Sequence, residues 1–133
     1  MVAPFIIDSD THITEPGDVW SSRVPAKYAD LMPHLTQDRN GVDVWVLKDR
    51  PIMRVGVTAP AGWPAWPPEF PPTIEECLPA AYDSTARLRY MDDNGIWASA
   101  LYPNIAGFGS QNFLAIEDEE AKLCAVRAYN DFL

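Results

Sequence analysis

The segment that most constrains the fold lies near the N-terminus, where the apolar residues 5–7 lead directly into the polar sequence DSDTHITEP. Three consecutive apolar residues without helical spacing predict a short buried strand over residues 4–10. A continuous apolar run that ends in polar residues is typical of parallel strands whose two faces are both covered. The chain is therefore expected to begin a parallel sheet, with acids and a histidine at the carboxyl end of its first strand.

The second half of the chain carries the elements that such a sheet needs. Asp83 is a candidate N-cap for a helix through STARLRYMDDN, and Gly95 stands where a glycine commonly ends a helix. The apolar stretch IWASALY predicts a second buried strand, stopped by Pro103, and a last amphipathic helix is expected to begin near Glu117. The order strand, excursion, helix, strand, helix predicts an α/β fold, because it is how parallel α/β domains begin.

The excursion between the two predicted strands contains a hairpin and a proline-rich loop. VDVWVL alternates between two faces, KDR supplies a turn and PIMRVGV returns the chain, which predicts an antiparallel hairpin over residues 42–57. Six of the thirteen prolines then fall between Pro60 and Pro72, and proline excludes an interior strand there. We interpret this Trp/Pro loop as a stiff segment whose aromatic rings pack onto the domain or another subunit, or cover an active site.

Asp10 and His12 have the clearest chemical meaning in the N-terminal motif. They are two positions apart, so on an extended strand both side chains point to the same face. A carboxylate oxygen and an imidazole nitrogen can bind one divalent cation, and mixed donors suit zinc, manganese or iron(II). Asp8 is expected on the same face, and Glu15 lies just beyond the strand. The spacing also fits hydrogen-bonding caps at a strand end, so metal binding is one of two interpretations.

The wider pattern resembles a known family. IDSDTHITEP is similar to the first strand of the amidohydrolase-related family of metal-dependent hydrolases and decarboxylases, which includes aminocarboxymuconate-semialdehyde decarboxylase and the resorcylate decarboxylases. RLRYMDDNGIWASALYPN resembles the next element of that family, a helix with an R-x-x-x-M-D pattern followed by G-I and a strand that ends in proline. The hairpin and the Trp/Pro loop resemble an insertion found in many members.

This resemblance implies a metal-dependent TIM (β/α)8 barrel that acts on small, often aromatic, carboxylate or lactone-like substrates. In the family the first strand supplies the metal with H-x-H or an acid-x-His pair, which carries over to Asp10 and His12. Zinc is the expected ion, with manganese and iron as alternatives. The later histidine and aspartate ligands of the family have no counterpart here, so the isolated chain is expected to be inactive, and its catalytic residues stay unassigned.

The length agrees with part of such a barrel. A closed eight-stranded barrel takes about 250 residues, whereas this chain has 133. We expect a single incomplete domain over residues 1–133, with the metal motif at 4–16, the inserted hairpin and loop at 42–72, and a helix-strand-helix unit at 83–133. The last helical pattern reaches the final residue without a cap, which favours a truncated chain.

The net charge of the chain limits the classes of molecule that it is expected to bind. Ten Lys and Arg against nineteen Asp and Glu give a net charge of -9, which repels phosphate backbones and anionic membrane surfaces. Nucleic acid and membrane are therefore not expected as partners. No long apolar run or secretory signal is visible, so a cytoplasmic location is expected. The expected partners are a small carboxylate substrate and further copies of the chain in a homo-oligomer.

A second hypothesis is a non-catalytic binding or assembly domain, with Asp10 and His12 as caps. It would use the hairpin and the rings of Trp63, Trp66 and Phe70 as an interface, because aromatic residues are enriched in interface cores.

Two other features are weaker candidates for a site. His34, next to a proline and between apolar residues, is expected to be buried or to cap a turn. The sequence GFGS after the second strand is a weak signal for backbone contacts to phosphate.

Overall fold

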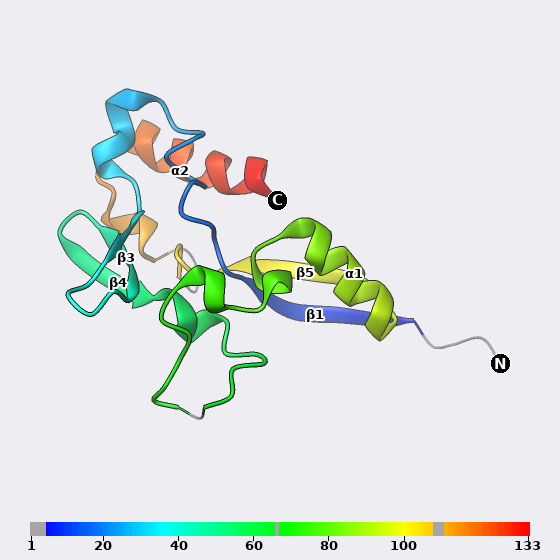
Figure 1. Cartoon of the computed structure of the whole chain (residues 1–133). Coiled ribbons are helices and arrows are strands. Elements are labelled where there is room, and N and C mark those ends of the chain that lie inside the picture. Colours follow the sequence, from blue (N-terminus) through cyan, green and yellow to red (C-terminus); the bar gives the residue numbers. More distant parts are fainter. Residues whose placement is uncertain (1–4, 66, 108–110) are drawn as a thin grey trace.

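The computed structural model describes residues 5–65, 67–107 and 111–133. Its regular elements form two small sheets and two α-helices among these residues (Figure 1). The strands are β1 (Ile6–Ile13), β2 (His34–Gln37), β3 (Asp43–Leu47), β4 (Arg50–Arg54) and β5 (Ile96–Pro103), and the α-helices are α1 (Ser84–Asn94) and α2 (Glu119–Phe132). Short 3-10 helices are η1 (Ala26–Leu31), η2 (Val55–Thr58), η3 (Ile74–Glu76), η4 (Pro79–Ala81) and η6 (Phe113–Ala115).

The predicted parallel pair is present. β1 pairs with β5 in parallel, and α1 leads directly into β5. The side chain of Asp83 caps α1 by accepting a hydrogen bond from the backbone N–H of Ala86 at 2.7 Å. Gly95 ends the helix at a φ of 67°, in the left-handed region that glycine adopts without strain. The α/β class and both predicted ends of this helix are therefore confirmed.

The predicted hairpin is present within a three-stranded antiparallel sheet of order β2-β3-β4. β3 turns into β4 through two residues, and the buried face of β3 carries Trp45 and Leu47. The expected return strand ends early, at Arg54, because Val55 turns into the core as η2 begins. β2 was not predicted, since HLTQ has a single large apolar residue and no clear alternation. The hairpin thus offers its aromatic face to the chain's own core.

Gly56 allows the backbone after the hairpin to approach the end of the Trp/Pro loop closely. A Cβ atom at this position would lie 1.9 Å from the carbonyl oxygen of Pro71. We expect Gly56→Ala to lower the free energy of unfolding by about 2 kcal/mol, because backbone has to move. Urea denaturation followed by circular dichroism measures this loss. Gly17→Ala is the control, since its Cβ would meet only the flexible Leu35 side chain at 3.3 Å; equal losses at the two positions would contradict the packing argument.

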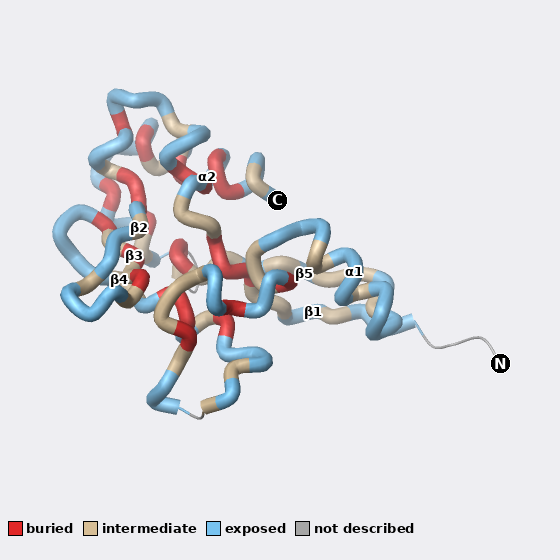
Figure 2. Tube along the Cα trace, in the orientation of Figure 1, coloured by how far each residue is buried: buried red, intermediate tan, exposed pale blue. Residues whose placement is uncertain are grey.

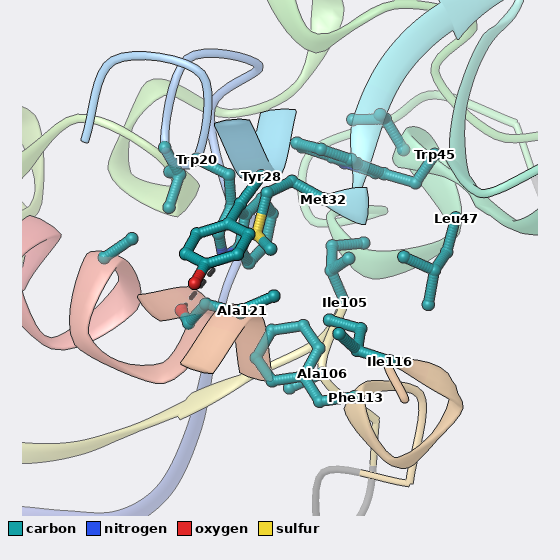
Figure 3. Packing of buried hydrophobic residues seen from close by; sticks show 14 of the residues in the cluster. Trp20, Tyr28, Met32, Trp45, Leu47, Ile105, Ala106, Phe113, Ile116 and Ala121 are labelled. Carbon is teal, nitrogen blue, oxygen red and sulfur yellow. Dashed lines mark hydrogen bonds between the residues drawn. The ribbon is translucent and has the colours of Figure 1, made fainter. Parts of the chain in front are cut away.

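The hydrophobic core lies between α2 and the antiparallel sheet (Figure 2). Trp20 is at its centre and is fully buried, with edge-to-face contacts to Trp45 and Phe113 at centroid distances of 5.2 and 5.8 Å (Figure 3). Its Nε1 atom donates a hydrogen bond to the carbonyl oxygen of Ala125 on α2 at 3.1 Å. The buried face of α2 is built largely of alanines, at positions 121, 125 and 128, so the helix backbone comes close to the indole ring.

The parallel pair and α1 stand apart from this core (Figure 2). Ile7 is 65% exposed and Trp97 is 67% exposed, and α1 has no buried residue. The expectation that both strands are buried is therefore wrong, although both strands form. Parallel strands are normally covered on both faces, and here α1 covers one face of a sheet of two strands. None of the helices in the described part of the chain is long and apolar enough to cross a membrane.

Candidate metal centre

Asp10 and His12 meet on the carboxyl-terminal half of β1. The Oδ1 atom of Asp10 lies 3.8 Å from the Nε2 atom of His12. The Asp10 side chain is 81% exposed and the His12 side chain 33% exposed. In a parallel barrel this end of the strands is where catalytic residues gather. The fold thus brings the two predicted donors together at the end of the strand where a ligand could reach them.

A β-bulge in β1 determines which side chains lie on the same face as Asp10 and His12. The pairing register advances three residues on β1, from Asp8 to Thr11, for two residues on β5. The extra residue puts Asp8 and Thr11 on the same face, and the hydroxyl of Thr11 donates a hydrogen bond to the Asp8 carboxylate. His12 is on the other face. The expectation that Asp8 shares a face with Asp10 and His12 is therefore wrong, because strict alternation fails at a bulge.

The ligand atoms of Asp10 and His12 are of the types that bind divalent cations, but two ligands are fewer than a catalytic site has. A carboxylate oxygen and an imidazole nitrogen suit zinc, manganese or iron(II), whereas catalytic zinc has three protein ligands. Within residues 5–65, 67–107 and 111–133, no group of three or more His, Cys, Asp and Glu side chains is placed to hold an ion. Asp10 and His12 alone are thus one protein ligand short of a catalytic zinc site.

Two neighbours define the surroundings of His12. Tyr102 pairs with it across the parallel sheet, and the two rings lie 6.0 Å apart between centroids. From α1, an Nη2 atom of Arg87 reaches the carbonyl oxygen of His12 at 3.5 Å. Burial lowers the pKa of Arg87, while the negative charge of Asp8 raises it. Arg87 thus joins α1 to the backbone of the candidate ligand.

Glu15 is the most unusual charged residue near the pair. It is fully buried, and its Oε1 atom accepts hydrogen bonds from the backbone N–H groups of Asn104 and Ile105, each at 2.9 Å. Burial raises the pKa of Glu15 to about 7, although these hydrogen bonds act in the opposite direction. Burial and the charge of Glu15 also raise the pKa of Tyr129 on α2. Glu15 therefore joins the ends of β1 and β5 from within the core.

Little in the sequence predicts this role of Glu15. The residue lies just beyond the predicted strand, where no local pattern fixes the geometry of its side chain. Its position between a buried strand end and Pro16 is a usable signal, because a fixed backbone aims a side chain reproducibly. The N–H groups that donate to Glu15 follow β5 about ninety positions later, and no local pattern predicts that contact.

A groove of about 720 Å3 runs beside β1, between α1 and the Trp/Pro loop. Its volume is within the range of pockets that bind small organic ligands. The lining is mostly apolar, with Trp63 and several prolines on one side and Tyr90 and Met91 on the other. His12 and Arg87 also line it. The Trp/Pro loop therefore forms one wall of a groove, in agreement with the expectation that it could cover a site. Trp66 lies outside the described residues.

The weaker candidates do not add to this site. His34 is exposed on β2, and its Nδ1 atom lies 3.4 Å from the carbonyl oxygen of Met32, which is a local contact. Three residues of the GFGS sequence, 108–110, lie outside the described residues, so its expected contact with phosphate is untested.

Comparison with known proteins supports the fold. No protein-family model matches the sequence, and no curated protein matches it. Among solved structures, the chain is similar to an amidohydrolase from Mycobacterium avium subsp. paratuberculosis K-10, with a TM-score of 0.65 and 20% sequence identity. The similarity covers 100% of this chain and 38% of that one. The chain thus has the fold of somewhat more than a third of that amidohydrolase, which fits part of a TIM barrel.

Proposed function

We propose that the chain is the N-terminal portion of a metal-dependent enzyme of the amidohydrolase superfamily, and that Asp10 and His12 bind its divalent metal ion. The observation that carries this proposal is the meeting of the two side chains, 3.8 Å apart, on the first strand of a fold similar to an amidohydrolase. Zinc is the proposed ion, with manganese and iron as alternatives. The remaining ligands would come from outside these 133 residues.

The proposed substrates are small carboxylic acids, aromatic ones in particular. The groove beside β1 offers an aromatic and proline-rich wall for an apolar ring, and Arg87 lines it near His12. A divalent ion at Asp10 and His12 would supply Lewis-acid chemistry, which serves both hydrolysis and non-oxidative decarboxylation. The residues of this chain would bind the ion, orient the imidazole and exclude water from the apolar side of the groove.

Metal binding by the chain itself tests this proposal. His12 and His34 are its only two histidines, so their ring signals in NMR spectra can be assigned by substitution. We expect added Mn2+ to broaden the His12 ring signal at concentrations that leave the His34 signal sharp. His12→Gln and Asp10→Asn are each expected to weaken Zn2+ binding about tenfold or more, because each removes one of the two ligands.

His34→Gln is the matched control, since it removes the other imidazole at an exposed site on β2. It is expected to leave Zn2+ affinity unchanged. Equal affinities for the wild-type chain, His12→Gln and His34→Gln would contradict the assignment of the metal pair.

A further inference from the structure

Two groups of hydrogen bonds join the carboxyl ends of β1 and β5. In the first group, Oε1 of Glu15 accepts from the backbone N–H groups of Asn104 and Ile105. In the second, the side-chain Nδ2 atom of Asn104 donates to the carbonyl oxygen of Ile13 at 2.8 Å. Asn104 directly follows the last residue of β5, and the acceptors are Ile13, the last residue of β1, and Glu15, two residues beyond it. Because each strand end is bound to the other, neither can shift alone.

The segment that carries Glu15 is also held from its other side. The N–H of Thr14 donates to the carbonyl oxygen of Ala81 at 2.9 Å, and its hydroxyl lies 3.1 Å from the hydroxyl of Thr58. Residues 14 and 15 are thus bonded to η4, to η2 and to the segment after β5. The β1 end is fixed three residues away from His12.

We propose that Glu15 is a positioning residue for the metal-binding pair, which fixes the carboxyl end of β1 on that of β5 and thereby sets His12 against Tyr102. His12 and Tyr102 are lateral neighbours in the parallel pair, and each stands within three residues of the hydrogen-bonded junction. The relevance to metal binding rests on the proposed function. The His12–Tyr102 contact can be measured without any metal, so the two proposals can fail separately.

Asp43 provides a comparison within the same chain. It is also a buried carboxylate, 5% exposed, and its Oδ2 atom accepts from the backbone N–H of Ile74 at 3.0 Å. Its other oxygen accepts from the side chain of Gln37 at 3.1 Å. Asp43 belongs to the antiparallel sheet and makes no contact with the β1–β5 junction among these bonds. Substitution of either carboxylate by alanine removes buried hydrogen bonds. Only the substitution of Glu15 is expected to change the position of the His12 ring.

The test is the nuclear Overhauser contact between the rings of His12 and Tyr102 in the metal-free chain. Glu15→Ala is expected to weaken or abolish it, whereas Asp43→Ala leaves it intact. Glu15→Gln is expected to retain it, because the amide oxygen can accept the same two N–H bonds. If Glu15→Ala does not fold, Asn104→Ala removes the side-chain hydrogen bond to the carbonyl oxygen of Ile13 and is expected to weaken the same contact.

Metal affinity gives a second readout on folded chains. Glu15→Ala is expected to weaken Zn2+ binding about tenfold to a hundredfold, with recovery in Glu15→Gln, as for other residues that orient metal ligands. A His12–Tyr102 contact that survives in both Glu15→Ala and Asn104→Ala would overturn the proposal. Loss of the contact in Asp43→Ala to the same extent would also overturn it, because the effect would then reflect general destabilisation.

Discussion

Trp20→Ala is expected to lower the free energy of unfolding by about 3–5 kcal/mol, the range observed when large aromatic residues are removed from cores. The indole is fully buried, contacts Trp45 and Phe113 edge to face, and donates a hydrogen bond to Ala125. Its removal leaves a cavity at the junction of the antiparallel sheet and α2, and leaves the carbonyl oxygen of Ala125 without this donor. Urea denaturation followed by circular dichroism measures the loss.

Trp97→Ala is the matched control, because it removes the same side chain from the parallel pair. Trp97 is 67% exposed, and its ring contact is with Phe5 at 6.0 Å between centroids. We expect a loss of about 1 kcal/mol or less. Similar losses at the two positions would show that the parallel pair contributes as much as the core to the stability of this chain, contrary to the observed burial.

Local signals in the sequence predicted local structure well. The caps of α1 lie at Asp83 and Gly95, and the hairpin forms within residues 42–57, because each depends on residues that are close in sequence. The burial of β1 was predicted wrongly for a different reason. An apolar run shows that a strand can be buried, but whether it is buried depends on what else packs on the sheet. In this structure residues 5–7 remain exposed.

The candidate metal site shows the same contrast between local contacts, which the sequence predicts, and long-range contacts, which it does not. Asp10 and His12 lie close together, as their two-residue spacing predicts, although Asp10 lies within the bulged stretch between Asp8 and Thr11. The same rule failed for Asp8, which precedes the bulge. The role of Glu15 depends on partners after β5 and could not be read from its neighbours in sequence. Contacts between residues two positions apart are therefore easier to predict than long-range contacts or the face of a residue on the far side of a bulge.

The stability of the wild-type chain is expected to fall between about pH 5 and pH 8 because of Glu15. The pKa of its buried carboxyl rises from 4.5 to about 7 on folding, so in this interval the folded chain binds more protons than the unfolded chain. Stability then decreases as pH rises and levels off above the folded pKa. At about 1.4 kcal/mol per pKa unit, the loss is on the order of 3 kcal/mol.

Urea denaturation of the wild-type chain and of Glu15→Gln over this pH range isolates the contribution of Glu15, since glutamine keeps the accepting oxygen but does not titrate. We expect the difference in unfolding free energy between the two chains to shift by about 3 kcal/mol in favour of Glu15→Gln from pH 5 to pH 8. Asp43→Asn, at the other buried carboxylate, controls for the loss of one acid. Parallel pH curves for the wild-type chain and Glu15→Gln would mean that the carboxyl ionises as readily in the folded chain as in the unfolded one. The energetic cost of holding a charge at the junction of β1 and β5 would then be absent.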